Sequence, residues 1–134
     1  MLEITREIRD AVLAHARRDH PDECCGVLVA APGGPLRVVP MLNAERSPTG
    51  FTFDSGEWLR VNRAMEEADE ELVGVYHSHT MTEAFPSRTD VRWSANTPGA
   101  HWLLASTRSA DDELRSFTIV DGEITEEEVR VTDG

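Results

Sequence analysis

The sequence contains no lysine, so its positive charge rests on 13 arginines, against 25 acidic residues and a formal net charge of −12 over 134 residues. Such an excess of negative charge repels the phosphates of nucleic acids and the headgroups of anionic membranes. We therefore expect no nucleic acid and no membrane among the main partners. Hydrophobic residues make up 40% of the chain, which is enough for one buried core and argues against disorder.

Cysteine is also scarce. The chain has two, Cys24 and Cys25, and an ordinary disulfide between adjacent residues is geometrically implausible. Unpaired cysteines fit a reducing cytosol. Because cysteine is among the most buried residue types, we interpret both thiols as core packing rather than as metal ligands or nucleophiles. Long apolar runs are missing too: none reaches membrane-spanning length, and residues 1–6 lack the apolar core of a signal peptide. The sequence therefore predicts a cytoplasmic protein.

Internal repeats and linkers are also missing, so residues 1–134 are predicted to form a single α/β domain. Its architecture is predicted to be a mixed, mostly antiparallel β-sheet with helices packed on it. Apolar periodicity predicts helices over residues 5–19, from Asp54 or Ser55 to about residue 68, and over 88–96. Strands are predicted over residues 23–31, 36–42, 51–53, 72–76, 101–106, 114–120 and 123–131. Turn signals at 32–35 and 121–122 predict two hairpins, and the tryptophans and phenylalanines are predicted to be core residues.

Two histidines follow the predicted strand over residues 72–76. If that strand continues through His79, the imidazoles of His77 and His79 leave the same face of the sheet. Two ligands do not hold zinc against water, and Asp90 is the nearest plausible third ligand, in the first turn of a helix that Ser87 would cap. Two imidazoles, one carboxylate and a water make the open tetrahedral site of a catalytic zinc. The pattern is typical of a metal hydrolase.

Each half of this pattern also has a purely structural interpretation. Ser87-x-x-Asp90 matches a capping box, which many proteins without catalytic activity contain, and a His-x-His on a strand is commonly structural. The other three histidines have no partner at ligand spacing and are interpreted as structural or surface residues: His15, His20 and His101. A deaminase-type zinc site is excluded because the sequence has no Pro-Cys-x-x-Cys.

Taken together, the two halves form His-x-His-x7-Ser-x2-Asp, which resembles the JAMM motif of the MPN (Mov34) metalloproteases. That family also has a glutamate at the start of an upstream strand, and Glu23, followed by Cys-Cys-Gly-Val-Leu, fits this place. The resemblance implies a cytidine-deaminase-like MPN fold and one Zn²⁺ per chain, with the ligands His77, His79 and Asp90. It further implies that Glu23 takes the proton of the attacking water without binding the metal, and that Ser87 stabilises the oxyanion. Without the motif, Glu23 would be interpreted as an exposed carboxylate just past a helix, and Ser87 would be interpreted as a helix cap.

Longer segments resemble one subfamily, the actinobacterial peptidases that release cysteine from a sulfur-carrier protein. The segments are residues 15–23, 43–49, 77–80 and 83–90. Thr80, where the wider family most often has proline, fits this subfamily. The resemblance implies a ubiquitin-like sulfur-carrier protein with a C-terminal Gly-Gly as the partner, and hydrolysis of the Gly–Cys amide of a carrier–cysteine adduct. Two alternatives are a deconjugating peptidase for another ubiquitin-like tail and a non-catalytic MPN scaffold, although such scaffolds usually lose the ligands.

A narrow, extended Gly-Gly tail needs a channel that leads to the metal. The loops at residues 43–48 and 80–85 flank the strands expected near the site. We therefore expect these loops to form the walls of the channel, with Arg46 and Phe85 in contact with the tail.

Overall fold

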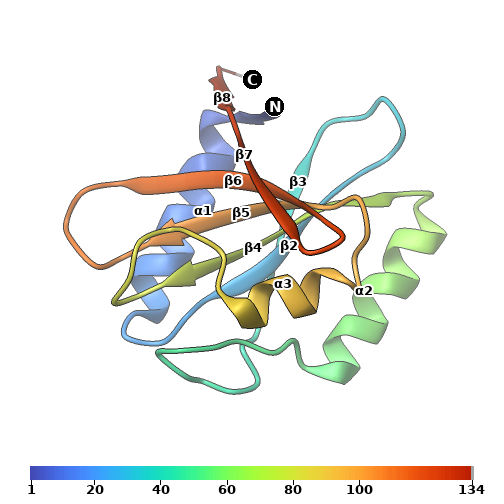
Figure 1. The fold of residues 1–134 in the computed structure, drawn as a ribbon. Helices are drawn as coiled ribbons and strands as arrows, with labels where there is room; N and C mark the ends of the chain where they lie inside the picture. Colours follow the sequence, from blue (N-terminus) through green and yellow to red (C-terminus); the bar gives the residue numbers. More distant parts are fainter. Residues whose placement is uncertain (134) are drawn as a thin grey trace.

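The computed structural model describes residues 1–133. Its elements are β1 (Leu2–Thr5), α1 (Arg6–Asp19), β2 (Cys25–Ala30), β3 (Arg37–Met41), α2 (Ser55–Glu67), β4 (Glu71–His79), α3 (Arg88–Ser94), β5 (His101–Ser106), β6 (Glu113–Val120), β7 (Glu123–Glu127) and β8 (Val129–Thr132). Six strands form the main sheet in the order β3-β2-β4-β5-β6-β7 (Figure 1). All neighbouring strands of this sheet are antiparallel except β4 and β5, which are parallel. The predicted mixed, mostly antiparallel sheet is confirmed.

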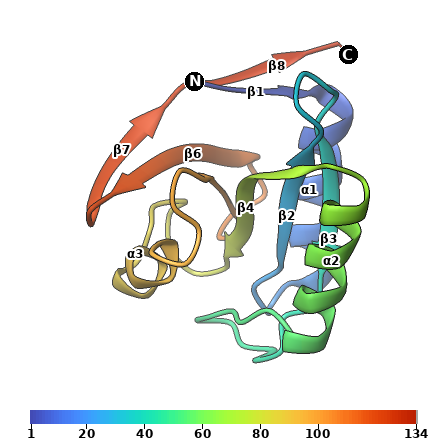
Figure 2. The same cartoon turned by 90° about the vertical axis from the view of Figure 1, so that its right-hand side faces the viewer.

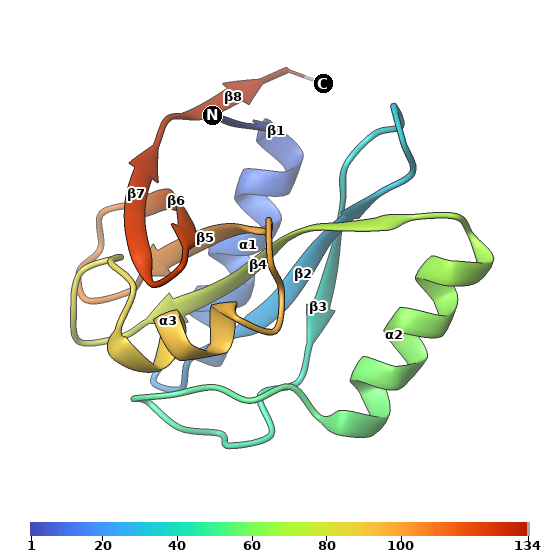
Figure 3. The ribbon, with the colours of Figure 1, turned by 45° about the vertical axis from the view of Figure 1, so that its right-hand side comes forward.

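Apolar side chains cover both faces of the main sheet. On one face α1 and β1 pack against the sheet in a cluster that includes Val12, Leu28 and Tyr76. On the other face α2 and α3 close a second cluster, which includes Val75 and Trp102. Figure 3 shows α1 behind the sheet and α3 in front of it. Within residues 1–133, none of the helices is both long and apolar enough to cross a membrane.

The chain starts with a strand, not with the helix predicted over residues 5–19. Leu2–Thr5 forms β1, which pairs in parallel with β8 away from α3 (Figure 2). The helix begins at Arg6 because the hydroxyl of Thr5 accepts the N–H of Ile8 at 3.1 Å and so acts as its cap. The strand predicted over residues 123–131 is likewise divided at Glu128, since β7 pairs with β6 whereas β8 pairs with β1. β1 and β8 have four residues each, and an alternating pattern of that length is too short to indicate that they pair.

Other predicted elements are confirmed with small changes. Asp54 caps α2 by accepting the N–H of Glu57 at 2.9 Å, and β4 continues through His79, which meets the condition for His77 and His79 to share a face. The hairpin turn at residues 121–122 has positive φ at both positions, as a two-residue turn of this type requires. The strand predicted over residues 51–53 is wrong, because only a single bridge joins Asn43 and Phe53. The prediction that Phe85 is a core residue is also wrong, because the residue is 41% exposed.

Gly26 in β2 allows the ring of Tyr76 to cross the strand. A Cβ at position 26 would lie 2.2 Å from Cε2 of Tyr76, whose ring is fully buried and whose hydroxyl lies 2.7 Å from Nδ1 of His15. The ring therefore has no room to move aside. We expect Gly26→Ala to lower the free energy of unfolding by about 1–3 kcal/mol, measured by denaturant melting. Gly56→Ala, on the exposed first turn of α2, is the control and should not destabilise the protein, because alanine favours helix. Equal stability of the two variants would contradict this account of Gly26.

Candidate metal centre

The end of β4 presents two imidazoles to one face of the sheet and one hydroxyl to the other. The ring centroids of His77 and His79 are 5.1 Å apart. Ser78, which lies between them, points to the opposite side, where its Oγ accepts the N–H of Cys24 at 2.8 Å. The backbone N–H of Ser78 donates in turn to the carbonyl of Cys24 at 3.1 Å. The strand that carries both imidazoles is thereby fixed against the segment that leads into β2.

Asp90 reaches the same two imidazoles from the first turn of α3. Its Oδ1 lies 3.2 Å from Nε2 of His77, and its Oδ2 lies 3.3 Å from Nε2 of His79. Ser87 and Asp90 also form a complete capping box, in which Oγ of Ser87 accepts the N–H of Asp90 and Oδ2 of Asp90 accepts the N–H of Ser87. The capping box and the metal-ligand interpretation are therefore compatible, because the box orients the carboxylate toward the histidines.

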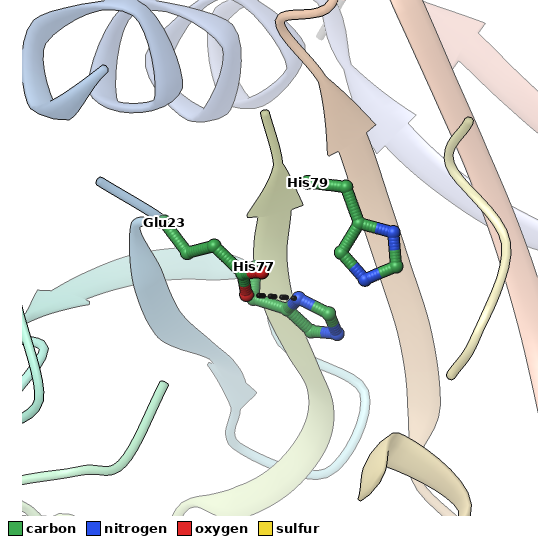
Figure 4. A group of neighbouring side chains, drawn as sticks. All are labelled: Glu23, His77 and His79. Carbon is green, nitrogen blue, oxygen red and sulfur yellow. Dashed lines mark ion pairs between the residues drawn. The ribbon is translucent and has the colours of Figure 1, made fainter. Parts of the chain in front are cut away.

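Glu23 faces the centre from the segment before β2 (Figure 4). Its Oε1 lies 3.6 Å from Nδ1 of His77, and it is buried, in contrast to the exposed carboxylate expected from the sequence without the motif. Glu23, His77 and His79 each offer one ligand atom, and these atoms lie within 4.8 Å of one another. The geometry therefore offers two carboxylates, from Glu23 and Asp90, beside the two imidazoles.

The electrostatics of the centre favour a cation. Burial opposes the charged form of His77, yet the carboxylates of Asp90 and Glu23 outweigh it and raise the pKa of His77 to about 9. Burial likewise raises the pKa of Asp90, but the two imidazoles and the N–H of Ser87 hold that pKa well below its usual range. Positive charge is thus stabilised at His77 and negative charge at Asp90. A metal ion bound there would replace the proton of the imidazole, because histidine binds metals in its neutral form.

The hydrogen bonds at the histidines test whether the centre fits a metal ion. Among residues 1–133, neither ring nitrogen of buried His77 has a hydrogen-bond partner of acceptable geometry, although carboxylate oxygens face both. Nδ1 of His79 lies 3.0 Å from the carbonyl of Glu83, and donation to that oxygen leaves Nε2 as the nitrogen with the lone pair. Unsatisfied buried nitrogens beside carboxylates, with an outer hydrogen bond that sets the tautomer, are typical of metal ligands. The donor set fits a metal ion.

Aromatic rings support the centre, which the sequence did not indicate. The ring of Phe51 stacks on His77 with a centroid distance of 4.6 Å and an interplanar angle of 26°. Trp102 meets the same imidazole edge to face at 5.8 Å. Both rings were predicted only as core. Phe51 is 26 positions away from His77 in the chain, and no local pattern links the two.

A cleft of about 220 Å³ opens onto the centre. It is lined by Glu23, Ser87, Thr89, Asp90 and residues 48–51 and 79–82. The two expected loops therefore contribute, but the walls begin and end elsewhere than predicted. Arg46 lies in a neighbouring hollow on the other side of Glu23, and Phe85 packs edge to face on Phe117 at 5.3 Å. Both were predicted on the channel and lie outside the cleft.

The remaining candidate residues have structural partners. His15 contacts the hydroxyl of Tyr76, and His20 lies 2.7 Å from Oγ1 of Thr107. His101 pairs with Glu127, so the interpretation of all three histidines as structural or surface residues is confirmed. Cys24 and Cys25 are buried free thiols. Burial raises the pKa of Cys24 to about 12 and that of Cys25 well above its usual range, so both stay protonated and neither is a reactive thiolate.

Comparison with known proteins identifies the family. Residues 5–120 match the prokaryotic homologs of the JAB domain, and the chain belongs to this family. It is 57% identical over 136 residues to the CysO-cysteine peptidase of Mycobacterium tuberculosis, with 99% of this chain and 92% of that protein covered. It is 36% identical over 114 residues to the desampylase of Haloferax volcanii, with 78% and 80% covered. A JAB1/MPN domain protein from Archaeoglobus fulgidus has the same fold, with a TM-score of 0.66 at 17% identity over 98% of this chain and 97% of that one. The predicted MPN fold is confirmed.

Proposed function

We propose that this protein is a zinc peptidase that hydrolyses the Gly–Cys amide of a ubiquitin-like sulfur-carrier protein carrying a C-terminal cysteine, and so releases cysteine. The observation that carries the proposal is the convergence of two buried imidazoles and two carboxylates at one centre, of which Glu23, His79 and Asp90 line the cleft. The 57% identity to a CysO-cysteine peptidase over 99% of the chain supports the choice of substrate. We further propose that the chain acts as a single domain. Its unpaired cysteines support a location in the reducing cytoplasm.

His77, His79 and Asp90 are the proposed ligands of the metal. Zinc bound there would lower the pKa of a water to about 7 and polarise the carbonyl of the substrate. Each ligand is held by a contact of its own: His79 by the Glu83 carbonyl, Asp90 by the capping box, and His77 by the aromatic rings around it. Such supporting contacts keep the donor atoms in place before the metal arrives.

Glu23 is the proposed base, which takes the proton of the attacking water and delivers it to the leaving nitrogen of cysteine. Glu23 lines the cleft and is only 5% exposed, so bulk water has little access to its carboxylate. In this role it remains outside the set of ligands, although its oxygen lies close enough to join them.

Ser87 can serve two purposes at once. Its Oγ accepts the N–H of Asp90 at 3.1 Å, which uses a lone pair and leaves the hydroxyl hydrogen available. Ser87 also lines the cleft, and we propose that this hydrogen is donated to the oxyanion that forms when the amide carbonyl is attacked. The cap holds the oxygen in position, and the donated hydrogen stabilises the developing charge.

Replacing Ser87 with asparagine separates these two purposes. Asparagine caps helices about as well as serine, so Ser87→Asn should melt close to the wild-type temperature. Its amide cannot occupy the position of the hydroxyl, so we expect turnover to fall by about 10²–10³-fold. Melting and steady-state turnover measured on the same zinc-loaded preparation check this. Wild-type turnover with unchanged melting would leave Ser87 as a helix cap alone.

The decisive test of the function uses a purified carrier–cysteine adduct. After incubation with the zinc-loaded protein, mass spectrometry should find the carrier lighter by one cysteine residue, and a chelator should abolish the change. An adduct of unchanged mass would overturn the proposal. Cleavage of a carrier joined to a lysine side chain, without cleavage of the cysteine adduct, would favour a deconjugating peptidase, which the 36% identity to a desampylase keeps in view.

The proposed approach of the substrate carbonyl to the metal predicts which tails are accepted. Glycine has no side chain, so a Gly-Gly tail in the cleft of about 220 Å³ can bring its scissile carbonyl close to the metal and to Ser87. Replacing the last or the penultimate glycine of the carrier with valine should therefore lower kcat/KM by at least about tenfold, because a branched side chain adds steric cost at a close approach. Equal cleavage of Val-tailed adducts, or of unstructured peptides that end in Gly-Gly-Cys, would indicate a general peptidase.

A further inference from the structure

Asn43 lies two residues after the end of β3, and all the hydrogen-bonding groups of its buried side-chain amide have partners. Its Nδ2 donates to the carbonyl of Glu23 at 3.0 Å and to that of Gly50 at 2.9 Å. Its Oδ1 accepts the N–H of Glu45 at 3.0 Å and that of Thr52 at 3.1 Å. A carboxamide has two donor hydrogens and two acceptor lone pairs, so all four are occupied. Each partner is a backbone group of Glu23 or of residues 45–52.

Glu23 depends on this loop for its position. It precedes β2 and lies outside the sheet ladder, which begins at Cys25. Its N–H donates to the carbonyl of Ser47 at 2.8 Å, and its carbonyl accepts from Asn43. Both backbone polar groups of Glu23 are therefore bonded to residues 43–47. Without these two bonds, no backbone hydrogen bond of Glu23 itself would fix its position, because the sheet ladder begins only after it.

The same loop is tied to the strand that carries the histidines. The hydroxyl of Thr80, the first residue after β4, donates to the carbonyl of Pro48 at 3.0 Å. On the other side of Glu23, Cys24 is bonded to Ser78, between the two histidines. Glu23 is thus bracketed by Ser78 through Cys24 and by Asn43 through the loop. These bonds connect the position of its carboxylate to the position of the imidazoles.

We propose that Asn43 is a positioning residue for proton transfer, because its amide holds Glu23 and the loop at residues 44–50 in the one arrangement that aims the Glu23 carboxylate at the metal ligands. This inference rests on the proposed function. Asparagine suits the position because two carbonyl oxygens face Nδ2 and two N–H groups face Oδ1. Aspartate has the same shape but would set a carboxylate oxygen against both carbonyls.

Asn43→Asp is therefore the sharpest variant, since it keeps the two accepted hydrogen bonds and loses the two donated ones. Asn43→Ala, which loses all four, accompanies it. We expect kcat for the carrier–cysteine adduct to fall by about 10²-fold in each, as for a catalytic group displaced by about 1 Å. Zinc content should stay at one per chain, because neither variant touches a proposed ligand. Both are assayed below the lower of their two melting temperatures.

A second measurement does not depend on catalysis. In zinc-free protein, the amide of Glu23 should exchange its hydrogen at least about tenfold faster in Asn43→Asp than in the wild type, because its bond to Ser47 is no longer held. The amide of Val27, inside the β2 ladder, should exchange at the wild-type rate. Unchanged exchange at Glu23 would overturn the inference.

A double-mutant cycle separates positioning from a general structural role. If Asn43 acts through Glu23, then adding Asn43→Asp to Glu23→Gln should cost less than about twofold in residual turnover. Losses that multiply would show that Asn43 acts independently of Glu23, and the inference would fail while the proposed function stood. If Glu23→Gln itself had wild-type turnover, the proposed role of Glu23 would fail first.

Ser116→Ala is the matched control. Ser116 is fully buried in β6, and its hydroxyl donates to Glu127 at 2.9 Å, away from the cleft. Its loss should lower the melting temperature and leave kcat unchanged. A fall in kcat for Ser116→Ala equal to that for Asn43→Asp would attribute both to destabilisation alone.

Discussion

Glu23→Gln is expected to lower turnover of the carrier–cysteine adduct by about 10²–10⁴-fold while zinc stays bound. Glutamine has nearly the size and shape of glutamate, but an NH2 donor replaces one of the accepting oxygens and the amide cannot take a proton. The backbone bonds that hold Glu23, to Ser47 and Asn43, are unaffected by the change. Turnover and zinc content are measured on the same preparation, so that loss of chemistry is distinguished from loss of metal.

Zinc content is the sharper of these two measurements. Oxygen of Glu23 lies within 4.8 Å of the donor atoms of His77 and His79, so this carboxylate could itself be the third ligand. If Glu23→Gln lost both zinc and activity, Glu23 would be a ligand, and the base would have to be sought elsewhere. Glu66→Gln, an identical change at the exposed C-terminal end of α2, should leave both quantities unchanged.

His77→Ala should empty the centre. His77 is the most buried of the proposed ligands, and its nitrogens face both carboxylates. Removing it leaves one imidazole, and we expect the zinc content to fall from about one per chain to near zero, since a stable site needs three protein ligands. Activity should be lost with the metal. Elemental analysis of folded protein, with folding checked by circular dichroism, measures the loss.

Two companion variants make the metal experiment specific. Asp90→Ala should lose zinc as strongly as His77→Ala, and retention of zinc there would move the third ligand to Glu23. His20→Ala removes an exposed imidazole whose contact is with Thr107, and it should keep its zinc. Full zinc in folded protein that lacks both His77 and His79 would sink the assignment of the site.

The capping box at the start of α3 has both a structural and a functional role. Ser87 and Asp90 do form a capping box, as either interpretation predicts. The box turns the Asp90 carboxylate toward Nε2 of both histidines, at 3.2 and 3.3 Å. A local motif that stabilises a helix end therefore also delivers a ligand. The sequence contained the box, but only the packing of α3 near the end of β4 gave it this second consequence.

Local signals in the sequence were sufficient for three features whose cause is local. Asp54 caps α2, the turn at residues 121–122 has the positive φ angles of its type, and β4 places His77 and His79 on one face. Each follows from hydrogen bonds or from the side-chain period within a few residues. The resemblance of the motif then supplied Glu23, which no local pattern would have selected.

Tertiary structure alone decided the features that join distant parts of the chain. The pairing of β1 with β8, the burial of Glu23 and the position of Arg46 outside the cleft have no local signal. Asn43 looked like one polar residue in a loop, but its amide bonds that loop together at Glu45, Gly50 and Thr52 and joins it to Glu23. The physical reason is that a sequence pattern records which face of an element is apolar, whereas contacts between elements depend on how those faces pack in three dimensions.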